Sequence, residues 1–78
     1  MTREQFRSLK LGDVVRVQYS YWNSEKWFLV LIEGNRCLGE DYDNLYETSG
    51  RILSSRVYKE GIDWSLVESE CAAFELIA

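Results

Sequence analysis

The sequence predicts a mainly β protein, a small barrel of four to five short antiparallel strands. Apolar and polar residues alternate from Val14 to Tyr21, every residue from Trp27 to Ile32 is apolar, and glycines without any proline separate the candidate strands. A chain of 78 residues builds only one core, so we expect a single domain over residues 1–78. Curling one sheet until its edges approach buries a face and removes exposed edges, which favours a barrel.

The N-terminal residues predict a short helix or turn over residues 3–8. Thr2 and Gln5 have the spacing of a capping box, in which each side chain accepts a hydrogen bond from the other residue's backbone. Phe6 and Leu9 then fall on one face of such a helix.

The next two segments predict the central hairpin. Between Val14 and Tyr21 the odd positions are apolar, as in a strand with one face on the core and one in water. The apolar run from Trp27 to Ile32 is too short for a helix and predicts a central strand buried on both faces. The segment between them, residues 22–26, is polar apart from Trp22 and is expected to be a loop.

Turn residues divide the second half of the chain. The pair Gly34-Asn35 predicts a turn, with a new strand from Arg36 to Leu38. Residues 39–50 are acidic and aperiodic and predict a loop or a bent strand, and residues 52–59 predict a strand that Gly61 ends.

The C-terminal segment is compatible with two structures. We expect a turn over Asp63–Leu66 and a final strand over Ala72–Ile77. A helix is the alternative, because Val67, Cys71, Phe74 and Ala78 recur at helical spacing.

The composition argues against an enzyme, a cofactor and a metal site. Histidine is absent, which removes the usual general base near neutral pH and the commonest metal ligand. Cys37 and Cys71 match neither a zinc ribbon nor a CxxC motif, and we expect buried free thiols, with a disulfide as the alternative. The acidic residues from Glu40 to Glu47 do not fit a calcium loop, because Tyr46 stands where that loop needs glycine.

Charge is unevenly distributed along the chain. Residues 1–39 carry six basic against four acidic residues, a net charge of +2, and residues 40–78 carry three against nine, a net charge of -6. This charge distribution disfavours binding of a nucleic-acid backbone, which requires a clustered basic surface. It permits a basic partner or a dimer. No apolar run reaches the roughly 20 residues that cross a bilayer and the N-terminus lacks a secretory apolar region, so we expect a cytoplasmic protein without membrane contact.

The segment GDVVRVQYSYWNSEKWFLVLI, residues 12–32, resembles the opening of an SH3-like barrel of the Tudor type. Residues 41–44, Asp-Tyr-Asp-Asn, resemble the D-Y-G-N motif of that family, and the resemblance covers about residues 12–58. In Tudor domains an aromatic cage binds a methylated arginine or lysine through the negative faces of its rings. The resemblance implies cage walls at Tyr19, Phe28 and Tyr42, with Asn44 as a hydrogen-bonding partner; Gly39 stands where the family has a further aromatic wall.

The function we expect is that of a non-catalytic binding module for a protein or peptide. Its predicted contact residues form an aromatic rim that consists of Tyr19, Tyr21, Trp22, Trp27, Phe28, Tyr42 and Asn44. Tyr19 and Phe28 could equally be core residues, and Trp64 is expected in the core. We expect Trp22→Ala to abolish partner capture with little change in the thermal midpoint.

The same residues are compatible with other functions. Arginines beside stacking rings would suit nucleotides or single-stranded nucleic acid, and an enzyme is a third hypothesis. In size and composition the chain resembles small phage-encoded accessory and inhibitor proteins. A homo-oligomer is a further expectation, because another copy could cover the apolar second strand and the C-terminal tail.

Overall fold

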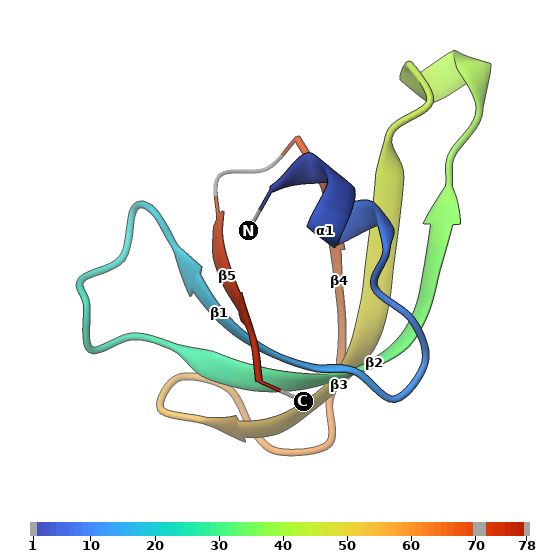
Figure 1. Ribbon diagram of the computed structural model, residues 1–78. Helices are drawn as coiled ribbons and strands as arrows, with labels where there is room; N and C mark the ends of the chain where they lie inside the picture. The colour runs from blue at the N-terminus through green and yellow to red at the C-terminus, as the bar shows by residue number, and fades with distance from the viewer. Residues whose placement is uncertain (1, 70–71, 78) are drawn as a thin grey trace.

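The computed structural model describes residues 2–69 and 72–77 and contains one antiparallel sheet of five strands. Its elements are α1 (Arg3–Arg7), β1 (Val14–Tyr19), β2 (Phe28–Cys37), the 3-10 turn η1 (Glu40–Tyr42), β3 (Tyr46–Ser55), β4 (Asp63–Val67) and β5 (Ala72–Leu76). The strand order is β4-β3-β2-β1-β5, and the sheet curls so that α1 lies over its open end (Figure 1). The predicted mainly β architecture is confirmed.

The first two strands carry most of the core. In β1, Val15 and Val17 are completely buried and the intervening residues are half-buried, which confirms the predicted alternation. In β2, Phe28, Val30 and Ile32 are also completely buried, whereas the residues between them are only half-buried. The prediction that this strand is buried on both faces is therefore wrong, because the core lies on the concave face of the sheet alone.

Side chains from the two edge strands close the core. Trp64 on β4 and Phe74 on β5 have ring centroids 6.3 Å apart. The Phe74 ring also makes an edge-to-face contact with Phe6 of α1, at 5.4 Å. The strands β4 and β5 stand at opposite ends of the strand order and do not pair within residues 2–69 and 72–77. These aromatic contacts therefore join the two edges of the sheet.

The helix α1 begins with the predicted capping box. The Thr2 hydroxyl accepts a hydrogen bond from the Gln5 backbone at 3.1 Å, and the Gln5 side chain accepts one from the Thr2 backbone at 2.8 Å. These two bonds satisfy backbone N–H groups that have no partner within the helix. The helix thus points Phe6 into the core.

The turn predicted at Gly34-Asn35 is wrong, because β2 continues through both residues. A register shift between Ile32 and Gly34 marks a β-bulge rather than a reversal. The Asn35 side chain donates hydrogen bonds to the carbonyl oxygens of Phe6 at 3.0 Å and Leu9 at 3.2 Å. A tertiary contact to the N-terminal segment thereby overrides the local turn preference of this dipeptide.

The chain reverses further on, at η1. Asp43 and Asn44 adopt left-handed conformations with φ of 58° and 56°, which aspartate and asparagine tolerate better than most residues. Of residues 39–50, expected to form a loop or a bent strand, the part from Tyr46 onward belongs to β3. Of the strand expected over residues 52–59, only residues 52–55 belong to β3.

The C-terminal predictions had mixed outcomes. The turn expected over Asp63–Leu66 is wrong, since β4 occupies these residues and points Trp64 and Leu66 into the core. The final strand is confirmed as β5 and the helical alternative is excluded for its residues. Cys37 is a free, exposed cysteine, so its predicted burial is wrong, and Cys71 lies outside the described residues.

Candidate functional site

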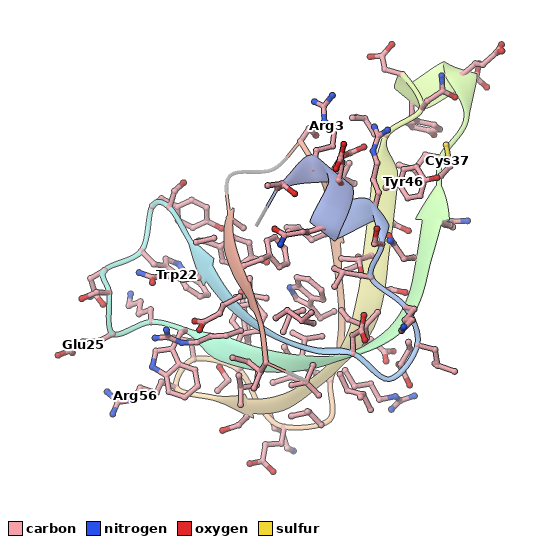
Figure 2. All side chains as sticks on the ribbon, in the orientation of Figure 1. Arg3, Trp22, Glu25, Cys37, Tyr46 and Arg56 are labelled. Atoms are coloured by element: carbon pink, nitrogen blue, oxygen red, sulfur yellow. The ribbon has the colours of Figure 1, made fainter. Side chains whose placement is uncertain are left out.

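Two loops meet at one end of the sheet. The β1–β2 loop leads into Phe28, and the register pairs Phe28 with Ser55, the last residue of β3, so the β3–β4 loop starts beside it. Figure 2 shows Trp22, Glu25 and Arg56 of these loops at the same end of the molecule. We define the aromatic patch as the rings that these loops carry, namely the exposed Tyr21 and Tyr58 and the half-buried Trp22.

The rings of the aromatic patch pack against aromatic rings of the core. Tyr21 stacks on Tyr19 with ring centroids 5.3 Å apart and planes 8° from parallel. Trp22 contacts Tyr19 edge-to-face at 4.8 Å and Tyr58 at 5.8 Å. Beneath them Tyr19 is 8% exposed and Phe28 is completely buried, whereas Tyr21 is 74% and Tyr58 37% exposed. The rings of the aromatic patch are therefore supported by the buried rings of Tyr19 and Phe28.

Local hydrogen bonds order both loops. In the β1–β2 loop the Asn23 side chain accepts from the Glu25 backbone at 3.0 Å, and the Gln18 side chain donates to the Asn23 carbonyl at 3.1 Å. In the β3–β4 loop the Ser55 hydroxyl accepts from the backbone N–H groups of Val57 and Tyr58, both at 2.9 Å. Loops ordered before binding lose less conformational entropy when a partner docks.

The structure divides the predicted rim into separate places. Tyr21 and Trp22 belong to the aromatic patch, and Tyr19 and Phe28 lie beneath it in the core. Trp27 is placed differently, with the Arg16 guanidinium 5.2 Å from its ring centroid.

The other two rim residues lie at the far end of β2. Tyr42 and Asn44 belong to the tip of the β2–β3 hairpin, which extends away from the β1–β2 loop (Figure 1). The ten residues of β2 separate the two ends by roughly 30 Å. The three cage walls implied by the Tudor resemblance, Tyr19, Phe28 and Tyr42, therefore do not surround a common space.

Tyr58 is an aromatic residue of the site that the sequence did not predict. Its segment was predicted to be a strand up to residue 59, whereas β3 ends at Ser55 and the chain bends there. The topology could have indicated this residue. An antiparallel meander brings its first and third connections, here the β1–β2 and β3–β4 loops, to the same end of the sheet.

Basic side chains without carboxylate partners flank the aromatic patch. Within the described residues, ion pairs with carboxylates involve five arginines, namely Arg3, Arg7, Arg16, Arg36 and Arg51. Lys26 of the β1–β2 loop and Arg56 and Lys59 of the β3–β4 loop are exposed and have none of these pairs. Glu25 and Glu60 share the two loops, so the local charge is close to neutral with a slight positive excess.

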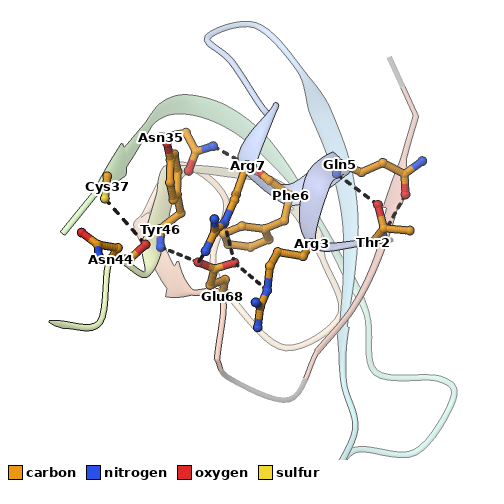
Figure 3. Close-up of polar contacts among 10 residues, drawn as sticks. All are labelled: Thr2, Arg3, Gln5, Phe6, Arg7, Asn35, Cys37, Asn44, Tyr46 and Glu68. Atoms are coloured by element: carbon orange, nitrogen blue, oxygen red, sulfur yellow. Dashed lines mark hydrogen bonds and ion pairs between the residues drawn. The ribbon is translucent and has the colours of Figure 1, made fainter. Parts of the chain in front are cut away.

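A second polar cluster has a structural role (Figure 3). Glu68 accepts hydrogen bonds from the Arg7 guanidinium, at 2.8 Å to Oε1 and 3.1 Å to Oε2, and from the Tyr46 backbone at 2.8 Å. The Arg3 guanidinium lies 3.7 Å away. The hydrogen bond from Arg7, followed by that from the Tyr46 backbone, lowers the pKa of Glu68 although burial opposes the shift. This carboxylate anchors α1 to the end of β4.

Comparison with family models, with curated proteins and with solved structures found no match. Among residues 2–69 and 72–77 there is no group of three or more acidic or thiol side chains that could hold a metal ion. No helix within these ranges has the length and apolar character needed to cross a membrane.

Proposed function

We propose that the protein is a non-catalytic binding module that engages a protein or peptide through the aromatic patch. The observation that carries this proposal is the exposure of two tyrosine rings, Tyr21 at 74% and Tyr58 at 37%, which both contact Trp22 and lie on loops ordered by their own hydrogen bonds. We further propose that the curled five-stranded sheet is an SH3-like barrel of the Tudor type. The proposal is supported by the antiparallel meander of β1 to β4, by the pairing of β5 with β1, and by the resemblance of residues 12–58.

The composition of the surface favours a protein partner. Tryptophan, tyrosine and arginine are the residues enriched among those that dominate binding energy at protein interfaces. The patch offers Trp22, two tyrosines and the neighbouring Arg56, and its two loops carry only a slight positive excess of charge. A supported ring surface gives a large contact area for little loss of side-chain entropy, as in other aromatic-rich binding surfaces.

A second candidate is single-stranded nucleic acid or a nucleotide. The observation in its favour is the position of Lys26, Arg56 and Lys59, exposed and without carboxylate partners, in the two loops that carry the rings. Sites for single strands combine base stacking on aromatic side chains with basic groups along the phosphates. The net charge of -4 opposes this candidate, because it repels a polyanion at long range.

The test compares capture by wild type, Tyr21→Ala and Tyr42→Ala. Each protein is immobilised, incubated with lysate of the source cells, and its bound proteins are quantified by mass spectrometry. Tyr42 is a matched control because it is 61% exposed at the far end of the hairpin. The proposal expects proteins that Tyr21→Ala loses and Tyr42→Ala retains. Equal capture by all three variants would contradict it.

The nucleic-acid candidate is tested directly by tryptophan fluorescence. Oligo-dT and oligo-U of 12 nucleotides are titrated at low and high salt, with Arg56→Glu as the comparison variant. Quenching that weakens with salt and disappears in Arg56→Glu would favour this candidate over a protein partner. An unchanged signal in both salts removes it.

A cytoplasmic location belongs to the same proposal. The exposed free thiol of Cys37 supports it, because exposed thiols persist in reducing compartments.

A further inference from the structure

The tip of the β2–β3 hairpin carries a charge opposite to that of the loops of the aromatic patch. Residues 38–45 hold no basic side chain and three acidic ones, all exposed, namely Glu40, Asp41 and Asp43. The two loops of the patch, residues 20–27 and 56–61, hold three basic and two acidic side chains. The net charge is therefore -3 at the tip and +1 at the patch loops. The two regions lie at opposite ends of β2 (Figure 1).

The charges of both regions lack ion-pair partners of their own. Among the described residues, the ion pairs involve none of the three tip carboxylates. They also involve none of Lys26, Arg56 and Lys59, the basic side chains of the patch loops. Within the same ranges Lys10 is the one other basic side chain without such a pair. Unpaired basic groups are thus concentrated beside the aromatic patch.

The hairpin tip presents an exposed ring among its carboxylates. Tyr42 is 61% exposed, and η1 stands clear of α1 (Figure 1). The N–H groups of Tyr42 and Asn44 donate to the Gly39 carbonyl at 3.1 and 2.9 Å. Below them the Leu38 N–H donates to the Leu45 carbonyl at 2.8 Å. Because these bonds already order the turn, the tip loses little conformational entropy when it docks on a surface.

The two regions are chemically complementary. The patch combines exposed tyrosines with unpaired basic groups, and the tip combines an exposed tyrosine with unpaired carboxylates. Tyr42 of one copy can pack against Tyr21 of another, since aromatic rings attract each other edge-to-face or offset-stacked. Arg56 can hold a tip carboxylate through two parallel hydrogen bonds.

We infer that the aromatic patch binds the hairpin tip of a second copy of this chain. The inference rests on the proposed function, because it uses the same patch, and it names a partner for it. Every copy carries both halves of the contact, so tip and patch are present at equal concentration. A copy whose tip is docked still has a free patch, so the contact is head-to-tail and extends into a row of copies or closes into a ring.

The separation of the two regions lets this attraction act despite the net charge of -4. The Debye length is about 10 Å at an ionic strength of about 0.1 M. The tip and the patch of one copy are roughly 30 Å apart. A docking tip is therefore attracted by the loops that it faces, while the distant acidic residues are screened. One hairpin tip makes a small contact, so we expect association between about 10 µM and about 1 mM.

Sedimentation equilibrium of the wild-type protein over this concentration range provides the first test. The inference predicts reversible association at about 0.1 M salt, with a dissociation constant that rises roughly tenfold or more at about 0.5 M. A monomer at every concentration would overturn the inference without any variant. If capture of other proteins through Tyr21 persists in that case, the proposed function stands with a different partner, so the two failures are distinguishable.

Two double variants then test the head-to-tail geometry. The patch variant combines Tyr21→Ala with Arg56→Ala, and the tip variant combines Asp41→Ala with Tyr42→Ala. All four side chains are exposed, so both variants should fold, and circular dichroism checks this. Lys10→Ala with Leu11→Ala is the matched control, because it removes an unpaired basic group and a side chain that is 75% exposed elsewhere on the surface.

The inference predicts that each double variant alone is monomeric and that the control associates like wild type. An equimolar mixture of the two variants should form a 1:1 complex, since the tip of one and the patch of the other are intact. A mixture that stays monomeric would overturn the inference. Association of either variant alone, or association that does not weaken with salt, would place the contact on another surface and overturn it as well.

Discussion

The indole N–H of Trp64 donates a hydrogen bond to the hydroxyl of Tyr19 at 3.0 Å in the buried core. This bond joins β4, one edge of the sheet, to the last residue of β1. The bond also supports the aromatic patch, since Tyr21 stacks on the Tyr19 ring.

Tyr19→Phe tests this support. The substitution leaves the Trp64 N–H buried without that acceptor, and we expect a loss of about 1–3 kcal/mol in the free energy of unfolding. Urea denaturation followed by tryptophan fluorescence measures it. Tyr21→Phe is the control, because its hydroxyl belongs to a side chain that is 74% exposed. Equal midpoints for wild type and Tyr19→Phe would contradict the assigned role of the bond.

Trp22 and Tyr21 should differ in their effect on stability. Trp22 contacts Tyr19, Tyr21, Phe28 and Tyr58, so Trp22→Ala should cost about 2 kcal/mol through lost burial. Tyr21→Ala should change stability by less than about 1 kcal/mol, because exposed side chains contribute little. Thermal midpoints of both variants check this. The earlier expectation that Trp22→Ala spares stability is thus replaced by one for Tyr21→Ala, and equal losses would contradict the new one.

Replacement by alanine should destabilise the protein at one glycine and have little effect at another. A Cβ on Gly50 would lie 2.1 Å from the Leu31 carbonyl oxygen, a backbone atom that cannot move independently. A Cβ on Gly34 would meet only the Ser49 hydroxyl, at 3.4 Å. We expect Gly50→Ala to lower stability by about 2 kcal/mol or more and Gly34→Ala to stay within about 1 kcal/mol of wild type. Chemical denaturation of the pair decides, and a stable Gly50→Ala protein would refute the close approach of β2 and β3.

Glu68 should make stability depend on acid pH. Its pKa in the folded protein is lowered from the ordinary value of 4.5. The stabilisation is therefore present above pH 4.5 and is lost as the pH falls from there through the lowered folded pKa. Glu68→Gln weakens these hydrogen bonds, at a cost of about 1–3 kcal/mol near neutral pH.

The measurement compares urea midpoints of wild type and Glu68→Gln at about pH 7 and about pH 3. The difference between the two proteins should be largest at neutral pH and shrink in acid. Glu47→Gln is the control, since its ion pair with Arg36 lies at the surface and surface pairs contribute little. A difference that does not vary with pH would contradict the role of the carboxylate.

The sequence predicted those elements in which local pattern and tertiary structure agree. The capping box at Thr2, the alternation of β1 and the final strand β5 follow from short-range rules. The turn at Gly34-Asn35 failed because Asn35 is bound by carbonyl groups of the N-terminal segment, a contact that no local window contains. The same limit applies to β4, whose Trp64 is fixed by Tyr19.

The candidate site was predicted in part for a similar reason. Tyr21 and Trp22 stood out because they border a polar loop after a clear strand. Tyr58 was not assigned to the site, and Tyr42 was wrongly grouped with Tyr21 and Trp22. Whether a loop lies at one end of the sheet or the other depends on where β2 ends. The continuation of β2 past Gly34 carries Tyr42 away from the aromatic patch.

The central claim is that a partner docks on the loops of the aromatic patch. Hydrogen exchange of the backbone amides, measured with and without the protein that Tyr21-dependent capture identifies, tests it most directly. The account predicts new protection in residues 20–27 and 56–61 together, with residues 38–45 unchanged. Protection confined to residues 38–45, at the hairpin tip, would contradict it.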